Sequence, residues 1–352
     1  MRRVLLILVL FGGLVGAASI GFALYLRDYL QAPGPLAART LVILPRGAGL
    51  AEIGRILAEA GAIRRPFLFQ LALRLSGRDR HLKAGEYELL PGMSPEEIIT
   101  KLERGAVFLH RITVPEGLTV AQIYDLLEAS DVLAGALPER PPEGSLLPET
   151  YFFPRGAARA QVVAAMREAM RKALAEAWEQ RSPELPLASP EELLILASIV
   201  EKETPLAEEY PLVAAVFANR LRRGMPLQSD PTVIYALTRG AQPLGRALTR
   251  ADLEIDDPYN TYRRGGLPPT PIANPGRAAL FATARPADVD FLYFVADGSG
   301  GHAFSRSLGE HNRKVRSWRR LRDSAPGRGS LPQDPNASAT AEQPAAPSTD
   351  GH

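Results

Sequence analysis

The chain has 352 residues, enough for two domains with hydrophobic cores of their own. Its 41 Lys and Arg residues nearly balance 39 Asp and Glu residues, so the charge gives no support for nucleic acid as a partner. There is no Cys, which excludes disulfides, a thiol nucleophile, Cys-based metal sites and a lipid-modified N-terminal Cys. With five His residues, a zinc site is a poor prediction.

The N-terminal segment has the pattern of a membrane anchor. Arg2 and Arg3 precede an uncharged apolar run over residues 4–26, long enough to cross a bilayer as a helix. The positive charge before the run predicts that residues 1–3 are cytoplasmic and that the chain after Arg27 lies outside. The alternative is a cleaved signal peptide with a small-residue site at 15–17. We favour the anchor because the apolar run continues well past that site.

A short linker is predicted over residues 27–37, and a weak repeat then organises residues 38–133. Three Pro-containing turns, at 45–47, 91–93 and 115–117, each lie between a strand-like piece and an amphipathic helix. The predicted strands are residues 41–44, 87–90 and 111–114, and the predicted helices are residues 50–60, 95–104 and 119–129. This pattern predicts a small α+β module that resembles LysM-like glycan-binding domains. A spacer that only sets the distance from the membrane is the alternative.

After a Pro-rich linker at 134–144, a second domain is predicted over residues 145–323. Its central helix, over 193–204, has start signals in Ser189 and Pro190 and is apolar on nearly every face, so it should be buried. It ends on Glu201 and Glu203. A carboxyl group beside packed aliphatic side chains loses solvation when it ionises, so its pKa rises and it can act as a general acid on a glycosidic bond. The alternative is the solvated end of a core helix.

Two later segments combine polar and aromatic side chains. Residues 227–235 place polar side chains before a helix, with Asp230 predicted as the N-cap and Pro231 as the first helical residue. Residues 257–269 form a predicted turn-rich loop whose Tyr, Asn and Thr side chains suit a sugar. A helix at 277–284, a β-hairpin at 292–305 and a basic helix at 308–321 follow. Residues 324–352 are predicted to be a disordered tail.

Five segments in chain order carry a resemblance to a known family. They are residues 197–204, 227–235, 259–262 and 266–269, and the stretch from Tyr293 through His302 to Phe304. Together they resemble the endolytic murein transglycosylases of the MltG/YceG-like family. The resemblance implies an α+β architecture with an N-terminal transmembrane helix, a small LysM-like module and a lysozyme-like catalytic domain.

The resemblance also implies roles for individual residues. By it, Glu201 is the catalytic acid. Glu203 follows two positions later and so faces another side of the helix, which suggests a structural partner, with Arg220 as a candidate. The residues implied to bind the substrate are Gln228, Ser229, Asp230, Tyr259, Asn260, Thr261 and Tyr262.

The implied reaction needs one carboxyl group and no metal or organic cofactor. Glu201 protonates the bond between N-acetylmuramic acid and N-acetylglucosamine within a glycan strand, and the acetamido group assists. Glu201 then takes a proton from the 6-hydroxyl, which closes an anhydromuramyl end and limits nascent glycan length. The implied partners are peptidoglycan strands, the cytoplasmic membrane and penicillin-binding-type synthases. The implied location is a single pass in the cytoplasmic (inner) membrane, with the catalytic domain outside.

Two alternatives come from other classes of function. One is a hydrolytic muramidase in which Asp230 supplies the second carboxylate. The other is a non-catalytic wall-binding scaffold in which Glu201 is only structural.

Overall fold

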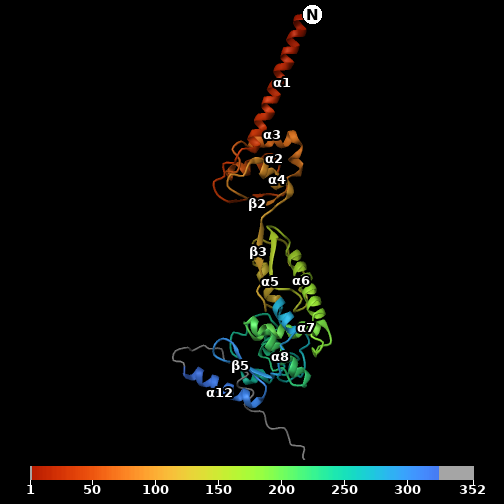
Figure 1. Cartoon of the computed structure of the whole chain (residues 1–352), viewed down its shortest axis with the longest axis vertical. Coiled ribbons are helices and arrows are strands. Elements are labelled where there is room, and N and C mark those ends of the chain that lie inside the picture. Colours follow the sequence, from red (N-terminus) through yellow and green to blue (C-terminus); the bar gives the residue numbers. More distant parts are fainter. Residues whose placement is uncertain (1, 325–352) are drawn as a thin grey trace, which may run out of the picture. The chain divides into compact units, whose positions relative to one another are not determined.

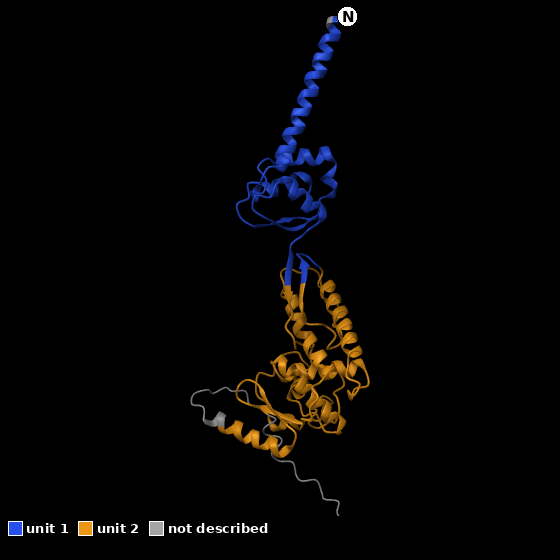
Figure 2. Cartoon of the chain, viewed as in Figure 1, with its two compact units in different colours: residues 1–111, 152–157 blue, residues 112–151, 158–352 orange. Residues whose placement is uncertain are grey.

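The computed structural model describes residues 2–324. The chain forms two compact units, Met1–Arg111 with Phe152–Ala157 and Ile112–Tyr151 with Ala158–His352 (Figure 2). Strands and helices alternate in the first unit and helices dominate the second, so the predicted α+β class is confirmed. The predicted tail, apart from Ser324, lies outside the described residues.

The first unit is built on a two-stranded sheet covered by helices (Figure 1). Strand β1 (Thr40–Leu44) pairs antiparallel with β2 (Gly85–Leu89), and Thr40 lies opposite Leu89. The helices are α1 (Arg2–Gln31), α2 (Leu50–Glu59), α3 (Pro66–Ser76) and α4 (Pro95–Arg104), with a 3-10 turn, Arg78–His81, after α3. The predicted strands and helices of this part agree with the structure to within two residues, whereas α3 has no counterpart in the sequence analysis.

Helix α1 combines an exposed apolar part and a packed end. Within residues 2–324 it contains the one stretch long and apolar enough to cross a membrane, Val4–Gln31, which suits an anchor or a signal sequence. Its last two turns behave differently, because Leu26 is buried and Tyr29 and Leu30 pack on the core of the first unit. The first five residues of the predicted linker, 27–31, are helical and continue α1. The packing of this end stabilises the helix because it buries apolar surface.

The second unit surrounds helix α7 (Pro190–Glu203) with other helices. Helices α6 (Arg159–Glu179), α8 (Tyr210–Arg222) and α11 (Arg277–Ala284) pack against it. The remaining elements are β3 (Leu109–Thr113), α5 (Val120–Glu128), β4 (Thr150–Pro154), the 3-10 turn Ala207–Glu209, α9 (Asp230–Thr238), α10 (Arg250–Leu253), β5 (Tyr293–Ala296), β6 (His302–Ser305) and α12 (Leu308–Ser324). Strands β3 and β4 pair with each other, and β5 pairs antiparallel with β6.

The buried character of α7 follows from its sequence. The Ser189 hydroxyl accepts the backbone N–H of Glu192 at 3.3 Å and caps the helix, as predicted. Every residue from Ile195 to Val200 is then buried. The helix ends at Glu203, so its last turn carries Glu201 from the core to the edge of the unit.

The predicted cap of α9 is wrong by one residue. Ser229 takes the N-cap position and Asp230 is the first helical residue. The Asp230 carboxylate accepts the hydroxyl of Tyr262. The predicted domain limits at 133 and 145, and the likeness to LysM-like and lysozyme-like domains, stay predictions. In the structure residues 112–133 belong to the second compact unit.

Candidate functional site

Glu201 is held at the end of α7 by two hydrogen bonds. One carboxyl oxygen accepts the Tyr210 hydroxyl at 3.0 Å, and the other accepts the backbone N–H of Gly276 at 2.9 Å. Tyr210 is the first residue of α8, and Gly276 is the N-cap of α11. Each carboxyl oxygen keeps further lone-pair capacity for a substrate group. Glu201 is half-buried, so it is neither a core group nor a freely solvated one.

The loop that carries Gly276 is fixed to the turn at residues 115–118. The N–H of Gly117 donates to the carbonyl of Asn274 at 3.0 Å, and the N–H of Asn274 donates to the carbonyl of Leu118 at 2.9 Å. The fully buried Asn274 side chain adds bonds to the Leu118 carbonyl and the Leu146 N–H, both at 2.9 Å. These bonds join segments far apart in the chain into one rigid wall of the site.

This wall brings a second carboxylate beside Glu201. A Cβ atom on Gly276 would lie only 1.8 Å from Oε1 of Glu116, so the Glu116 carboxyl group rests directly against Gly276. The backbone N–H of the same glycine holds Glu201. The Glu116 side chain as a whole is exposed, and its carboxyl end is the part that lies against the loop.

The surroundings favour the protonated form of Glu201. Burial raises the pKa of the Glu201 carboxyl above its usual range, and the negative charge of Glu116 raises it further. The hydrogen bonds from Gly276 and Tyr210 and the charge of Lys202 oppose the rise without cancelling it. Burial and the charge of Glu149 also raise the pKa of Glu116.

Lys202 is the cation of the site. Its Nζ donates to the Gly117 carbonyl at 3.1 Å, and burial lowers its pKa. Lys202 also lines a cavity of about 390 Å³, together with Tyr235, Ile234, Ile272 and Arg246. Carbon-rich walls with a few polar groups are typical of ligand pockets. None of the seven predicted substrate-binding residues lines this cavity.

Among the predicted residues 228–230, Ser229 contacts the end of α7 by a hydrogen bond to Glu203 rather than to Glu201. The Ser229 hydroxyl donates to Glu203, and Ser229 is fully buried. Gln228 has a positive φ of 51°, which strains a residue that is not glycine, and it lies within 3.4 Å of the Arg220 guanidinium. The charge of Glu203 raises the pKa of Arg220 against the larger lowering effect of burial, and Glu203 also accepts the Ser229 hydroxyl.

The predicted loop residues hold their own backbone in place. The buried Asn260 amide donates to the carbonyls of Leu253 and Ile255, both at 2.9 Å, and its oxygen accepts the N–H of Tyr262. The Thr261 hydroxyl accepts the Ser229 N–H at 3.0 Å, which ties the loop to α9.

The Tyr259 ring lies 4.9 Å from that of Tyr235, a residue of the cavity wall. The predicted contacts of these loop residues with sugar stay predictions.

Four residues around Glu201 are absent from the sequence-derived site: Glu116, Lys202, Tyr210 and Gly276. The Pro-Glu-Gly turn at 115–117, predicted as part of the repeat, is the sequence signal that points to Glu116. Within residues 2–324 there is no group of three or more His, Asp or Glu side chains suited to a metal ion.

The sequence model of the YceG-like family matches residues 42–317. The chain belongs to this family. It is 32% identical to a protein of Bacillus subtilis named endolytic murein transglycosylase, over 77% of this chain and 82% of that protein. It is 31% identical to a protein of the same name from Streptococcus pneumoniae, over 77% of this chain and 57% of that one.

Among solved structures, the chain is similar to a putative YceG-like protein from Listeria monocytogenes. The identity is 32%, the match covers 78% of this chain and 98% of that one, and the TM-score is 0.47.

Proposed function

We propose that this YceG-like family member is an endolytic peptidoglycan lytic transglycosylase with Glu201 as its single general acid and base. The observation that carries the proposal is a half-buried carboxyl group with a raised pKa, held by Gly276 and Tyr210 at the end of a core helix. Curated relatives that bear the transglycosylase name support the substrate and the reaction.

In the proposed reaction Glu201 first donates one proton to the substrate and later accepts one from it. Protonated Glu201 gives its proton to the glycosidic oxygen between N-acetylmuramic acid and N-acetylglucosamine, and the bond from that oxygen to the anomeric carbon breaks. The acetamido carbonyl oxygen bonds to the anomeric carbon. The 6-hydroxyl then displaces it, and its proton returns to Glu201. The product is an anhydromuramyl end, no water is consumed, and Glu201 is again protonated.

The test is the mass of the glycan ends. Sacculi digested with the wild-type chain should yield muramyl ends lighter by one water than the ends left by hydrolysis. Glu201→Gln should release few ends of either kind. Reducing muramyl ends, or normal release by the variant, would contradict the proposal.

A hydrolytic muramidase is the second candidate. The position of Glu116 favours a muramidase whose second carboxylate is Glu116 over one whose second carboxylate is Asp230, the residue predicted from sequence. Retaining hydrolases place two carboxyl groups on either side of the bond. Glu116, rather than Asp230, is the carboxylate that shares Gly276 with Glu201, and Asp230 is occupied by Tyr262. The same mass measurement separates the two candidates, because only hydrolysis adds water.

We also infer that α1 is an uncleaved single-pass anchor in the cytoplasmic (inner) membrane, with Arg2 and Arg3 inside and the catalytic part outside. The continuity of one helix from the apolar run into the packed residues Tyr29 and Leu30 supports this. Sequencing the N-terminus of the protein purified from membranes tests it. A mature start near Ala18 would show cleavage instead.

The remaining partners follow from this placement. A glycan-cutting enzyme at the membrane surface should meet nascent strands, so we propose penicillin-binding-type peptidoglycan synthases as neighbours and a glycan-binding or spacing role for the LysM-like module. Crosslinking in cells tests the first point, and sedimentation of the chain with purified sacculi tests the second. Recovery of no cell-wall synthase would contradict the proposed association.

A further inference from the structure

Helix α3 of the first unit is apolar on two faces. Its inner face, with Phe69, Ala72 and Leu73, is buried in the core. On the outer side, Phe67, Leu71 and Leu75 recur at four-residue spacing, so they form one stripe along the helix. Phe67 is 72% exposed and Leu75 is 67% exposed, and Leu71 between them is half-buried. An exposed stripe of large apolar side chains marks a surface that contacts something other than water.

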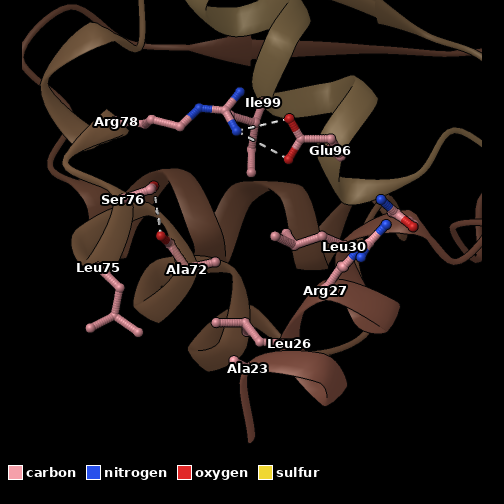
Figure 3. A pocket seen from close by; sticks show the side chains of 11 residues that line it. Ala23, Leu26, Arg27, Leu30, Ala72, Leu75, Ser76, Arg78, Glu96 and Ile99 are labelled. Carbon is pink, nitrogen blue, oxygen red and sulfur yellow. Dashed lines mark hydrogen bonds and ion pairs between the residues drawn. The ribbon is translucent and has the colours of Figure 1, made fainter. Parts of the chain in front are cut away.

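The stripe lies at the level where the apolar part of α1 leaves the folded module. At one end of α3, the Tyr29 hydroxyl donates to the carbonyl of Arg65 at 3.0 Å, and the Arg65 guanidinium lies 5.9 Å from the centre of the Tyr25 ring. At the other end, Leu75 lines a pocket of about 380 Å³ together with Ala23 and Leu26 of α1 (Figure 3).

These contacts fix the direction of α3. Residues 23–29 of α1 cover about 9 Å along that helix, whereas the 11 residues of α3 extend about 16 Å. Both ends of α3 therefore meet the same short part of α1 only if the two helices cross. Figure 3 shows Leu75 pointing away from Arg78 and Glu96, toward the side on which Ala23 lies. Because α3 is longer than the part of α1 that its two ends meet, α3 crosses α1 steeply, and at the exit of the proposed anchor such a helix lies along the membrane surface.

The charges around the stripe suit a phospholipid surface. Residues 64–76 include Arg64, Arg65 and Arg74, all exposed, and no Asp or Glu. Arg side chains place their apolar stems on the hydrocarbon and their charged heads among phosphates. Tyr25 and Tyr29 beside them have the amphipathic character typical of the membrane–water interface.

We propose that the Phe67–Leu71–Leu75 stripe of α3 is a membrane-docking surface whose partner is the headgroup and upper acyl region of an anionic phospholipid bilayer. This inference rests on the proposed anchoring by α1. Docking would hold the first unit against the bilayer instead of leaving it tethered by one helix alone.

Single-cysteine labelling of the full chain tests the proposal, since the chain has no native Cys. The variants Phe67→Cys, Leu75→Cys, Leu14→Cys in the apolar run, and Glu52→Cys on the exposed side of α2 carry a fluorophore. They are reconstituted in phosphatidylglycerol–phosphatidylcholine vesicles with brominated acyl chains. We expect strong quenching at Leu14 and several-fold more quenching at Phe67 and Leu75 than at the matched control Glu52.

The possible outcomes separate this inference from the anchor. Quenching at Leu14 together with control-level quenching at Phe67 and Leu75 overturns the docking surface and leaves the anchor. An unquenched Leu14 overturns the anchor and the inference with it. Protection of the fluorophores at Phe67 and Leu75 from quenching that grows with the protein-to-lipid ratio would show that a second copy covers the stripe. This result also overturns the inference.

A separate observation, the contact of Glu116 with Gly276, carries a second inference about the catalytic site. We propose that Glu116 is a positioning residue for the catalytic proton, because its carboxylate, held against Gly276, opposes ionisation of Glu201. This inference rests on the proposed general-acid role of Glu201. The charged and titratable groups around the two carboxyl groups are Glu149, Tyr210 and Lys202.

The expected sign follows from like-charge repulsion. Glu116→Gln removes a negative charge, so Glu201 should lose its proton at lower pH and the alkaline fall of the rate should move to lower pH. Gly276→Ala keeps the N–H bond to Glu201 but forces the Glu116 carboxyl group away, so it should move the fall in the same direction. Glu116→Asp keeps the charge and should shift the profile less than Glu116→Gln.

Glu149→Gln is the matched control, because Glu149 acts on Glu116 and is not among the groups that shift Glu201. A uniform loss of rate with an unmoved profile in Glu116→Gln and Gly276→Ala would mean that Glu116 is only structural. If Glu201→Gln itself retained activity, the proposed function would fail instead, so the two failures are distinguishable.

Discussion

The replacement Glu201→Gln separates the chemistry of this site from its architecture. The Gln carbonyl oxygen can accept the Gly276 N–H, and the amide NH₂ can donate to the Tyr210 hydroxyl oxygen, so both neighbours of Glu201 keep a partner. The variant loses only the transferable proton. General acid–base catalysis contributes about two to four powers of ten in rate, which corresponds to about 3–5 kcal/mol of barrier. We expect a loss of this size in turnover with the fold intact.

The same replacement should change stability in a defined direction. Because the pKa of Glu201 is raised in the folded chain, its contribution to stability is fully present below the ordinary Glu pKa and is lost as pH rises through the raised value. Gln does not ionise. The free energy of unfolding of Glu201→Gln should therefore improve relative to wild type as pH rises, with each unit of pKa rise worth about 1.4 kcal/mol.

The assay combines turnover on purified glycan strands with urea unfolding at pH 5 and pH 8. Glu203→Gln is the matched control, because Glu203 lies on the same helix turn but bonds to Ser229. The control should retain most of its turnover or lose it in proportion to stability. A near-normal rate for Glu201→Gln, or a variant that becomes relatively less stable as pH rises, would refute the reasoning.

Three further predictions concern neighbours of the site and the core. Tyr210→Phe removes a hydrogen bond that favours ionised Glu201, so the alkaline fall of the rate should move to higher pH in a pH–rate profile; a move to lower pH would contradict this. Asn274→Ala leaves buried groups unpaired and should lower the free energy of unfolding by about 2–4 kcal/mol in urea titrations, whereas a loss below about 1 kcal/mol would mean that water replaces the side chain. Phe217→Ala removes a ring that is 1% exposed and meets Phe294 edge-on, and calorimetry should show a loss of about 3–5 kcal/mol, with a much smaller loss arguing against this core.

The sequence by itself determined the local elements and the family. The capping signal of Ser189 and Pro190, followed by aliphatic residues on nearly every face, predicted a buried helix whose end carries Glu201 and Glu203, and α7 has this form. The charge-free run after Arg3 predicted the long apolar helix. Such features are readable because a cap, a helical period and an apolar run each depend on residues within a few positions of one another.

Only the tertiary structure decided which groups surround Glu201. Gly117 and Lys202 are 85 residues apart, and Gly276 lies 75 residues beyond Glu201, yet hydrogen bonds join them in one wall. No local pattern encodes the contact of Glu116 with Gly276, because it exists only once the loop at Asn274 pairs with the turn at Gly117. For the same reason the prediction of a sugar-binding role for Asn260 did not include the bonds that its amide makes to the loop backbone. A side chain's chemistry is set by its own atoms, but its partners are set by how the whole chain packs.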